Sequence, residues 1–305
     1  MAITSARIKI NGVWTNLTKN ASTGKWEAQA AAPGQTSFNL SGGYYPIEIE
    51  ETNDAGTKTT VNAQTSGIGT SCRLVVKENV KPVISLVYPT SGAHIANNKP
   101  VINMNITDEV GGSGVKISTL SLKVDSATYT NTSAGVVTSA ITNGYNVKFT
   151  PQSNLAEGSH TITVNIQDND GNAAVAVQIS FVVDTAPPVL NVTSPANNAV
   201  LAVASVNVAG TTNDVNSSPV TVKIKLNNVD QGAVTVNANG SFTKAITLAE
   251  GSNTIVVTAT DSAGVVATVT RTVTLDTTVP QITAVSLTPN PVTAGATVTI
   301  SVTIS

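Results

Sequence analysis

Carboxylate side chains are the groups of this 305-residue sequence whose spacing could support chemistry. Asp168 and Asp170 lie in the run Asp-Asn-Asp-Gly-Asn at 168–172, and Asp108 is followed by Glu109. Such groups supply the oxygen ligands that calcium takes, usually about 6–8 of them. The long loop ending in Glu that defines an EF-hand is missing, and Asp and Asn also close hairpin turns without a metal. We therefore predict a turn without metal or other cofactor, with calcium at Asp168 and Asp170 as the alternative.

The sequence offers less support for a nucleophilic active site than for a metal site. Cys72 is the only cysteine, so no disulfide can form within the chain, and His94 and His160 lie far apart in the sequence. A triad needs nucleophile, base and acid brought together, whereas Cys72 fits a small buried residue at the start of a strand over 73–76. The glycine-rich stretches at 67–69 and 111–114 precede no helix, so we predict loops rather than phosphate cradles. The sequence predicts no catalytic residue and no enzyme.

Aromatic residues gather at the beginning of the chain. Five of the eleven lie within the first 81 residues: Trp14, Trp26, Phe38, Tyr44 and Tyr45. Trp and Tyr offer large, rigid contact area to a partner protein or a sugar. The alternative is a small domain that fills its core with rings, and the alternation of Trp26 with two alanines is typical of a core residue. We name Trp14, Trp26, Tyr44 and Tyr45 as candidate partner contacts.

The charge composition excludes two classes of function. Charged residues make up 11% of the chain, against about 25% in ordinary domains, and 16 basic against 18 acidic residues give a net charge of −2. Without a basic excess, nucleic-acid binding loses its electrostatic driving force. No apolar run is long enough to insert in a membrane. Low surface charge leaves self-association unopposed, which is compatible with a homo-oligomer in a symmetric assembly.

An internal repeat is the strongest signal of fold. Residues 156–171 read AEGSHTITVNIQDNDG and residues 249–264 read AEGSNTIVVTATDSAG, and a weaker copy is GGYYPIEIEETNDAG at 42–56. Apolar residues alternate with polar ones, which predicts strands with one buried face. The turn of the second copy has one carboxylate fewer than that of the first, which argues against a metal. The residues predicted to face inward are Ile162, Val164 and Ile166 in the first copy, Ile255 and Val257 in the second, and Tyr45, Ile47 and Ile49 in the weaker copy.

Short proline-bearing junctions divide the chain. They lie at 77–82, 184–188 and 276–280, and proline stiffens such linkers. At roughly 100 residues per sandwich, we predict an all-β, rod-like array of tandem immunoglobulin-like sandwiches. The domains are a divergent N-terminal β-domain (1–81), two Ig-like domains (82–185 and 186–278) and the start of a further one (279–305). A fragment that short exposes strand edges, so we expect more chain or a partner to complete it.

The repeat pair, its Asp-bearing proline junctions and openings such as PPVLNVTSPANNAVL resemble bacterial Ig-like repeats. Such repeats occur in surface adhesins, secreted carbohydrate enzymes and phage virion proteins, and the resemblance covers 82–305. The opening ARIKINGVWTNLTKNASTGKWEAQAAAPG is similar to the N-terminal domain of Ig-like proteins in prophages of Gram-positive bacteria. The resemblance implies a structural or binding protein rather than an enzyme.

The first residues predict structure rather than a secretory leader. MAITSARIKINGVW fits a strand over 3–10, a turn at Asn11-Gly12 and a second strand from Val13. Together with the resemblance, this favours a virion protein of a phage tail, baseplate or neck, extracellular after lysis. Residues 1–81 would attach to other virion proteins, and the repeats would project toward a host-surface glycan or protein. The alternatives are a bacterial cell-surface adhesin or stalk, and an accessory array of a glycan-active enzyme.

Overall fold

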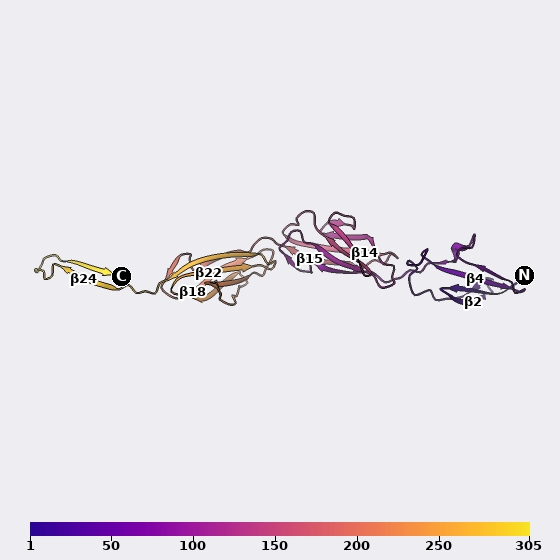
Figure 1. Cartoon of the computed structure of the whole chain (residues 1–305), viewed down its shortest axis with the longest axis horizontal. Helices are drawn as coiled ribbons and strands as arrows, with labels where there is room; N and C mark the ends of the chain where they lie inside the picture. Colours follow the sequence, from indigo (N-terminus) through magenta and orange to yellow (C-terminus); the bar gives the residue numbers. More distant parts are fainter. The chain divides into compact units, whose positions relative to one another are not determined.

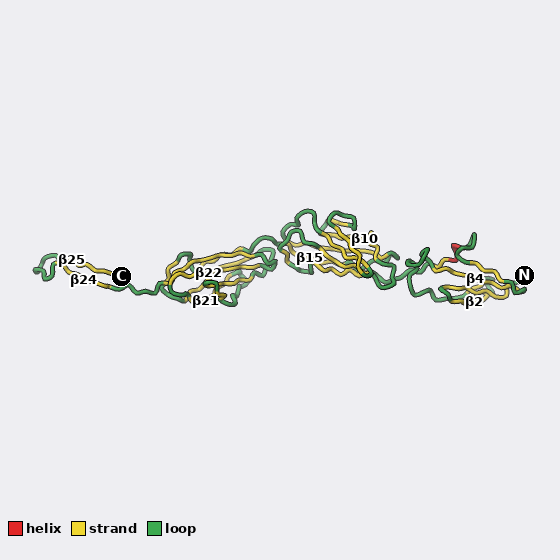
Figure 2. Tube along the Cα trace, viewed as in Figure 1, coloured by secondary structure: helices red, strands yellow, loops and turns green.

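The computed structural model describes residues 1–305, and its regular secondary structure is almost entirely β-strand, joined by loops and turns (Figure 1, Figure 2). The one helical element is a short 3-10 turn, η1 (Gly69–Cys72). No helix is long and apolar enough to cross a membrane. The chain divides into two compact units, Met1–Val183 and Asp184–Ser305.

The first unit begins with a single sheet, here called the N-terminal sheet. Its strand order is β3-β2-β1-β4-β5, with β6 paired to β4. The predicted first hairpin is confirmed, because Asn11 and Gly12 take positive φ values of 47° and 83°, as a tight two-residue turn requires. Its strands are β1 (Ile3–Ile10), β2 (Val13–Lys19), β3 (Trp26–Glu27), β4 (Tyr45–Asn53), β5 (Lys58–Val61) and β6 (Arg73–Leu74).

One face of the N-terminal sheet is charged. Lys9 lies opposite Trp14 on β2 and opposite Glu48 on β4, while Arg7 lies opposite Glu50. The guanidinium of Arg7 stacks 4.2 Å from the centre of the Trp14 ring and pairs with Glu50 at 3.0 Å. Trp14 therefore belongs to a polar surface and not to a core.

The other face of the sheet is apolar and incompletely covered. Ile8, Ile10, Ile47 and Ile49 are only half-buried there, including the two isoleucines of the third repeat copy that were predicted to face inward. The sheet has no second sheet packed on it. The buried apolar residues of this part of the chain are few: Ala6, Tyr45, Ala63 and Cys72.

The first sandwich completes the first unit. One sheet has the order β12-β13-β9-β7 and the other β11-β10-β14-β15-β8, with β8 parallel to β15. The strands of the first sheet are β7 (Val83–Tyr88), β9 (Ile102–Thr107), β12 (Val136–Ile141) and β13 (Gly144–Phe149). Those of the second are β8 (His94–Ile95), β10 (Val115–Val124), β11 (Ala127–Tyr129), β14 (Gly158–Asp168) and β15 (Val177–Val183).

Alternating residues from both sheets fill one core in the first sandwich. Every second residue of β9 is buried, as is every second residue of β14. This is the pattern of strands that have one face against a partner sheet. The predicted inward residues of the repeat are confirmed, since Ile162, Val164 and Ile166 are all at most 2% exposed.

The second sandwich, in the second unit, repeats this design. Its sheets have the orders β16-β18-β21 and β17-β23-β22-β19-β20, with β17 parallel to β23 as β8 is to β15. Ile255 and Val257 are fully buried, as predicted. The strands are β16 (Val189–Ser194), β17 (Ala199–Leu201), β18 (Ser205–Asn213), β19 (Thr221–Leu226), β20 (Val229–Asp230), β21 (Ser241–Thr247), β22 (Gly251–Thr260) and β23 (Val266–Leu275).

A two-stranded hairpin follows the second sandwich. Its strands, β24 (Ile282–Thr288) and β25 (Thr299–Ile304), are exposed along their whole length. The predicted all-β class with tandem sandwiches is confirmed.

Candidate metal centres

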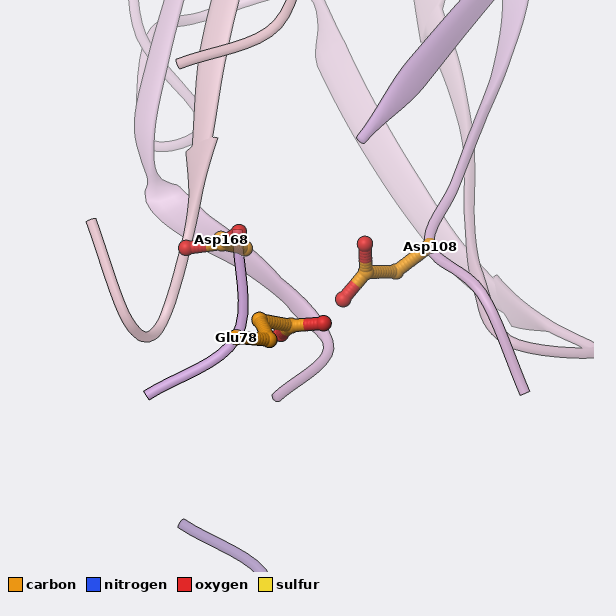
Figure 3. A group of neighbouring side chains, drawn as sticks. All are labelled: Glu78, Asp108 and Asp168. Atoms are coloured by element: carbon orange, nitrogen blue, oxygen red, sulfur yellow. The ribbon is translucent and has the colours of Figure 1, made fainter. Parts of the chain in front are cut away.

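Three carboxylates from separate segments meet at one end of the first sandwich (Figure 3). Glu78 lies in the segment that enters the sandwich, five residues before β7. Asp108 directly follows β9, and Asp168 is the last residue of β14. One oxygen from each lies within 4.8 Å of the others. These residues are called the first carboxylate cluster.

The turn after β14 fixes the carboxylate of Asp168. Its Oδ1 accepts hydrogen bonds from the backbone N–H groups of Gly171 (2.6 Å) and Asn172 (2.8 Å), and its Oδ2 accepts one from the Asn172 amide (2.7 Å). Asp168 is 0% exposed. The predicted turn at 168–172 is therefore present, and the same carboxylate also belongs to the cluster.

Asp108 and Glu78 each use one carboxylate oxygen for the backbone and keep the other free. Asp108 Oδ2 accepts from the N–H of Gly114 at 2.7 Å, and Glu78 Oε1 accepts from the N–H of Ser113. The remaining oxygens, Asp108 Oδ1 and Glu78 Oε2, are buried and have no hydrogen-bond partner. Buried polar atoms without partners are rare in native proteins and call for an explanation.

The glycine-rich loop at 111–114 packs closely against the carboxylates of the first cluster. A Cβ atom at Gly112 would lie 2.7 Å from the Glu109 carboxylate and 2.8 Å from Glu78 Oε2. Glu109 Oε2 is also buried and unpartnered. The sequence predicted a loop here rather than a phosphate-binding segment. Its backbone lies beside carboxylates and donates N–H groups to two of them.

Asp170, the second predicted calcium candidate, has a different role. Its Oδ2 accepts from the Thr36 hydroxyl at 2.5 Å and from the backbone N–H of Glu78 at 3.0 Å. These bonds tie the turn to the N-terminal sheet and its linker. The sequence grouped Asp168 with Asp170, whereas the structure groups Asp168 with Asp108 and Glu78.

The second sandwich carries an equivalent cluster of Asp184, Asp214 and Asp261, called the second carboxylate cluster. Asp184 lies five residues before β16, Asp214 directly follows β18, and Asp261 directly follows β22. One oxygen from each again lies within 4.8 Å of the others. Asp184 is 0% exposed and Asp261 is 6% exposed.

Backbone groups again hold one oxygen of each carboxylate and leave others free. Asp214 Oδ1 accepts from the N–H of Ser217 at 2.8 Å, and Asp261 Oδ1 accepts from the N–H of Val265 at 2.9 Å. Asp184 Oδ1 accepts from the N–H of Ala186 at 3.2 Å. The Oδ2 atoms of Asp184 and Asp261 are buried without a hydrogen-bond partner.

Both clusters hold negative charge in an unfavourable environment. Burial raises the pKa of Asp108, and the neighbouring Glu78 and Asp168 carboxylates add to this, against the hydrogen bond from Gly114. Burial also raises the pKa of Asp184, and Asp214 contributes in the same direction. Desolvation and like charges both favour the neutral carboxyl.

The donor set suits a hard divalent cation. All the ligand atoms are carboxylate oxygens, which calcium and magnesium prefer, whereas structural zinc is usually held by Cys and His. A bound cation would give the unpartnered oxygens the electrostatic partner that the protein chain does not supply. Glu78, Asp108 and Asp168 could hold one ion, and Asp184, Asp214 and Asp261 another.

Sequence reasoning missed Glu78, Asp184 and Asp214 as members of these groups. It looked for ligands close together in the sequence, whereas each cluster takes one residue from each of three distant segments. A comparison of the junctions would have found the first member, because Glu78 and Asp184 both lie five residues before the first strand of a sandwich.

The four predicted partner contacts are not equally accessible. Tyr45 is 7% exposed, and its hydroxyl donates to the Gln35 carbonyl at 3.2 Å. Tyr45 is therefore corrected from a contact residue to a buried residue, because little of its side chain is accessible to a partner. Trp14, Trp26 and Tyr44 are half-buried and keep part of their rings at the surface.

Cys72 is buried, as the sequence predicted, and His160 is buried as well. Cys72 is 2% exposed and directly precedes β6. His160 is 7% exposed, and its ring nitrogens lie 2.7 Å from Asp125 Oδ2 and 2.8 Å from the Ala156 carbonyl.

Each sandwich packs two mainly antiparallel sheets against each other, as an immunoglobulin-like domain does. In each, the first two strands, β7 and β8 or β16 and β17, belong to opposite sheets. Residues 96–185 match the family model described as "Bacterial Ig-like domain". Residues 188–277 match the model described as "Glucodextranase, domain B". The chain thus carries tandem bacterial Ig-like domains. No curated protein matches it.

Three solved structures show a weak likeness to this chain. The fibronectin(III)-like modules of Clostridium thermocellum CbhA are 16% identical, with 64% of this chain and 94% of that chain covered and a TM-score of 0.40. Sidekick-1 immunoglobulin domains 1–4 are 10% identical (89% and 67% covered, TM-score 0.35). The Bacteroides ovatus protein SGBP-B, solved with a mixed-linkage heptasaccharide, is 15% identical (95% and 69% covered, TM-score 0.20). Likenesses this weak assign no function.

Proposed function

We propose that the chain is a non-enzymatic attachment and spacer protein. The N-terminal sheet attaches it to a larger assembly, and the Ig-like sandwiches hold a distal binding surface away from that assembly. Repeated sandwich units tune length and reach, because each folds around its own core. The observation that carries the proposal is the difference in burial between the N-terminal sheet and the two sandwiches.

Each sandwich buries a continuous core drawn from both of its sheets. The N-terminal sheet instead leaves the isoleucines of its apolar face half-exposed. Covering an apolar face of this kind with a partner is favourable, because it removes apolar surface from water. The half-exposed rings of Trp26 and Tyr44 add rigid contact area to this part of the chain, whereas Trp14 lies on the opposite, charged face.

The assembly that we propose is a phage virion, with other virion proteins at the N-terminal sheet and a host-surface glycan or protein at the far end. Support comes from the resemblance of the opening segment to Ig-like prophage proteins. The matched family models and the structures named above carry no reference to phages. A bacterial cell-surface adhesin or stalk would use the same apolar face on a different anchor.

Localisation decides between the two assemblies. Antibodies against the Ig-like domains should label purified phage particles by immunogold microscopy, and the chain should appear in their mass spectra. Labelling of intact cells without particles would instead support the adhesin. Labelling of neither would contradict both assignments.

Point variants test the attachment surface without removing the sheet. Ile8 and Ile49 lie opposite each other on the apolar face, so Ile8→Lys with Ile49→Lys should abolish sedimentation with the assembly. Asn16→Lys places one lysine at an exposed position opposite Arg7 on the charged face and should leave attachment intact. Circular dichroism should show both variants folded. Normal attachment of the double variant would contradict the assigned surface.

Catalysis is tested separately. A broad hydrolase and transferase screen of the purified chain should give no turnover above buffer. Reproducible turnover would contradict the non-enzymatic assignment.

A further inference from the structure

We propose that each Ig-like sandwich binds one calcium ion at the end where the chain enters it, giving two ions per chain. The ligands are Glu78, Asp108 and Asp168 in the first sandwich, and Asp184, Asp214 and Asp261 in the second. The inference is independent of the attachment role proposed above.

The unpartnered oxygens are the first observation that points to a ligand. Asp108, Asp184 and Asp261 are each more than nine-tenths buried, and each keeps one oxygen without a hydrogen-bond donor. These oxygens belong to groups whose ligand atoms converge within 4.8 Å. A buried carboxylate is stable only when it is paired or coordinates a metal. The chain supplies no cationic partner by salt bridge to any of these three.

The free oxygens are held in place rather than left to rotate. In every case the other oxygen of the same carboxylate accepts a backbone N–H: Gly114 for Asp108, Ala186 for Asp184 and Val265 for Asp261. This hydrogen bond restricts the rotation of the carboxylate and so limits the positions that its second oxygen can take. Fixed ligands of this kind are a preorganised cation site.

The same arrangement is built twice on different local sequences. The entering segment supplies Glu78 in one sandwich and Asp184 in the other. The loop that supports the second ligand is a glycine-rich turn around Gly114 in the first, and an Asp-capped turn around Ser217 in the second. A turn requirement alone would explain Asp168 and Asp261, but not the carboxylates that converge on them from two other segments.

The ligand chemistry selects calcium. Each cluster offers one oxygen from each of three carboxylates, and calcium completes such a set with water or carbonyl oxygens in flexible geometry at about 2.3–2.6 Å. Magnesium demands a near-ideal octahedron and retains most of its water. Bound calcium would link the entering segment to the two loops that follow β9 and β14 in the first sandwich, and β18 and β22 in the second.

Calorimetric titration of the full chain, stripped with EDTA and dialysed free of it, tests the stoichiometry. Calcium chloride should bind with two ions per chain. Asp108→Asn and Asp261→Asn should each reduce this to one, and the double variant to none. Asp230→Asn is the matched control, since Asp230 is exposed on β20 and belongs to neither cluster, and it should keep two ions. Absence of binding at millimolar calcium, or equal binding of magnesium, would overturn the proposal.

Thermal unfolding distinguishes a carboxylate that binds calcium from one that only stabilises the fold. With calcium, the wild-type transitions should move to higher temperature, while the transition of the altered sandwich should not move. Without calcium, each Asn variant should be at least as stable as wild type, because it removes one of three converging charges. Variants destabilised equally with and without calcium would contradict the metal role, even if the attachment assay succeeds.

Discussion

A buried histidine should make the first sandwich, and not the second, sensitive to pH near neutrality. His160 bonds Asp125 Oδ2 and the Ala156 carbonyl, and the other oxygen of Asp125 accepts the N–H of Thr161 at 2.8 Å. Asn253 holds the corresponding place in the second sandwich, where its amide donates to the Ala249 carbonyl at 2.7 Å. In both sandwiches this side chain bonds the backbone carbonyl four residues before it. The side chain is ionisable in the first sandwich and neutral in the second.

The direction of the effect follows from the pKa of His160. Burial disfavours the charged ring, but the hydrogen bonds with Ala156 and Asp125 outweigh it, so the pKa is raised above 6.5. The stabilisation is therefore fully present below pH 6.5 and is lost as pH rises through the folded-state pKa. Hydrogen bonds to charged groups contribute about 1.5–3 kcal/mol. Since the Asp125 side chain is 45% exposed, solvent screening reduces this to about 1 kcal/mol.

The perturbation is His160→Asn, which keeps a hydrogen-bond donor for the Ala156 carbonyl but removes the charge. At pH 6 it should lower the stability of the first sandwich by about 1 kcal/mol, or ~4–8 °C in its transition. The loss should shrink as pH rises toward 8.5, while the transition of the second sandwich, which has Asn253, stays unchanged as the internal control. Differential scanning calorimetry of the full chain measures both transitions.

Proton NMR gives the titration directly, because the chain has only two histidines. The His160 resonance, identified by its loss in His160→Asn, should titrate above pH 6.5. In Asp125→Asn its midpoint should fall. A midpoint at or below 6.5, or one that Asp125→Asn leaves unchanged, would refute the reasoning.

Three further outcomes follow from packing and backbone conformation. Phe149→Ala empties a fully buried site and should lower the stability of the first sandwich by about 3–5 kcal/mol, measured by calorimetry; a loss below 1 kcal/mol would contradict the assigned core. Gly240→Ala should destabilise the second sandwich more than Gly232→Ala, because both have positive φ but only at Gly240 would a Cβ collide, at 2.2 Å, with the Thr212 carbonyl; denaturant titration compares them, and equal losses would contradict the clash. Cys72, 2% exposed, should react with a thiol reagent only in denaturant, and rapid reaction in the native chain would show an accessible thiol.

Strand periodicity predicted the two sandwiches because their strands face one core and water alternately. Ile162 and Ile255 fall in place for that reason, and both are fully buried. The same pattern over 42–56 predicted buried isoleucines, yet Ile47 and Ile49 are only half-buried. Alternation shows which residues share a face of a sheet. It does not show whether a second sheet covers that face, which depends on strands elsewhere in the chain.

The carboxylate clusters could not be predicted by local spacing, because a sandwich brings together the ends of strands that are distant in the sequence. The second repeat has Ala263 where an offset of 93 residues places Asp170, and this counted against a metal. In the structure Asp170 bonds Thr36 and the backbone of Glu78 instead, so its absence from the second sandwich removes no member of the shared cluster. The residues to compare were those at equivalent strand ends. Such a comparison needs the strand boundaries first, and it would pair Asp108 with Asp214 directly after β9 and β18.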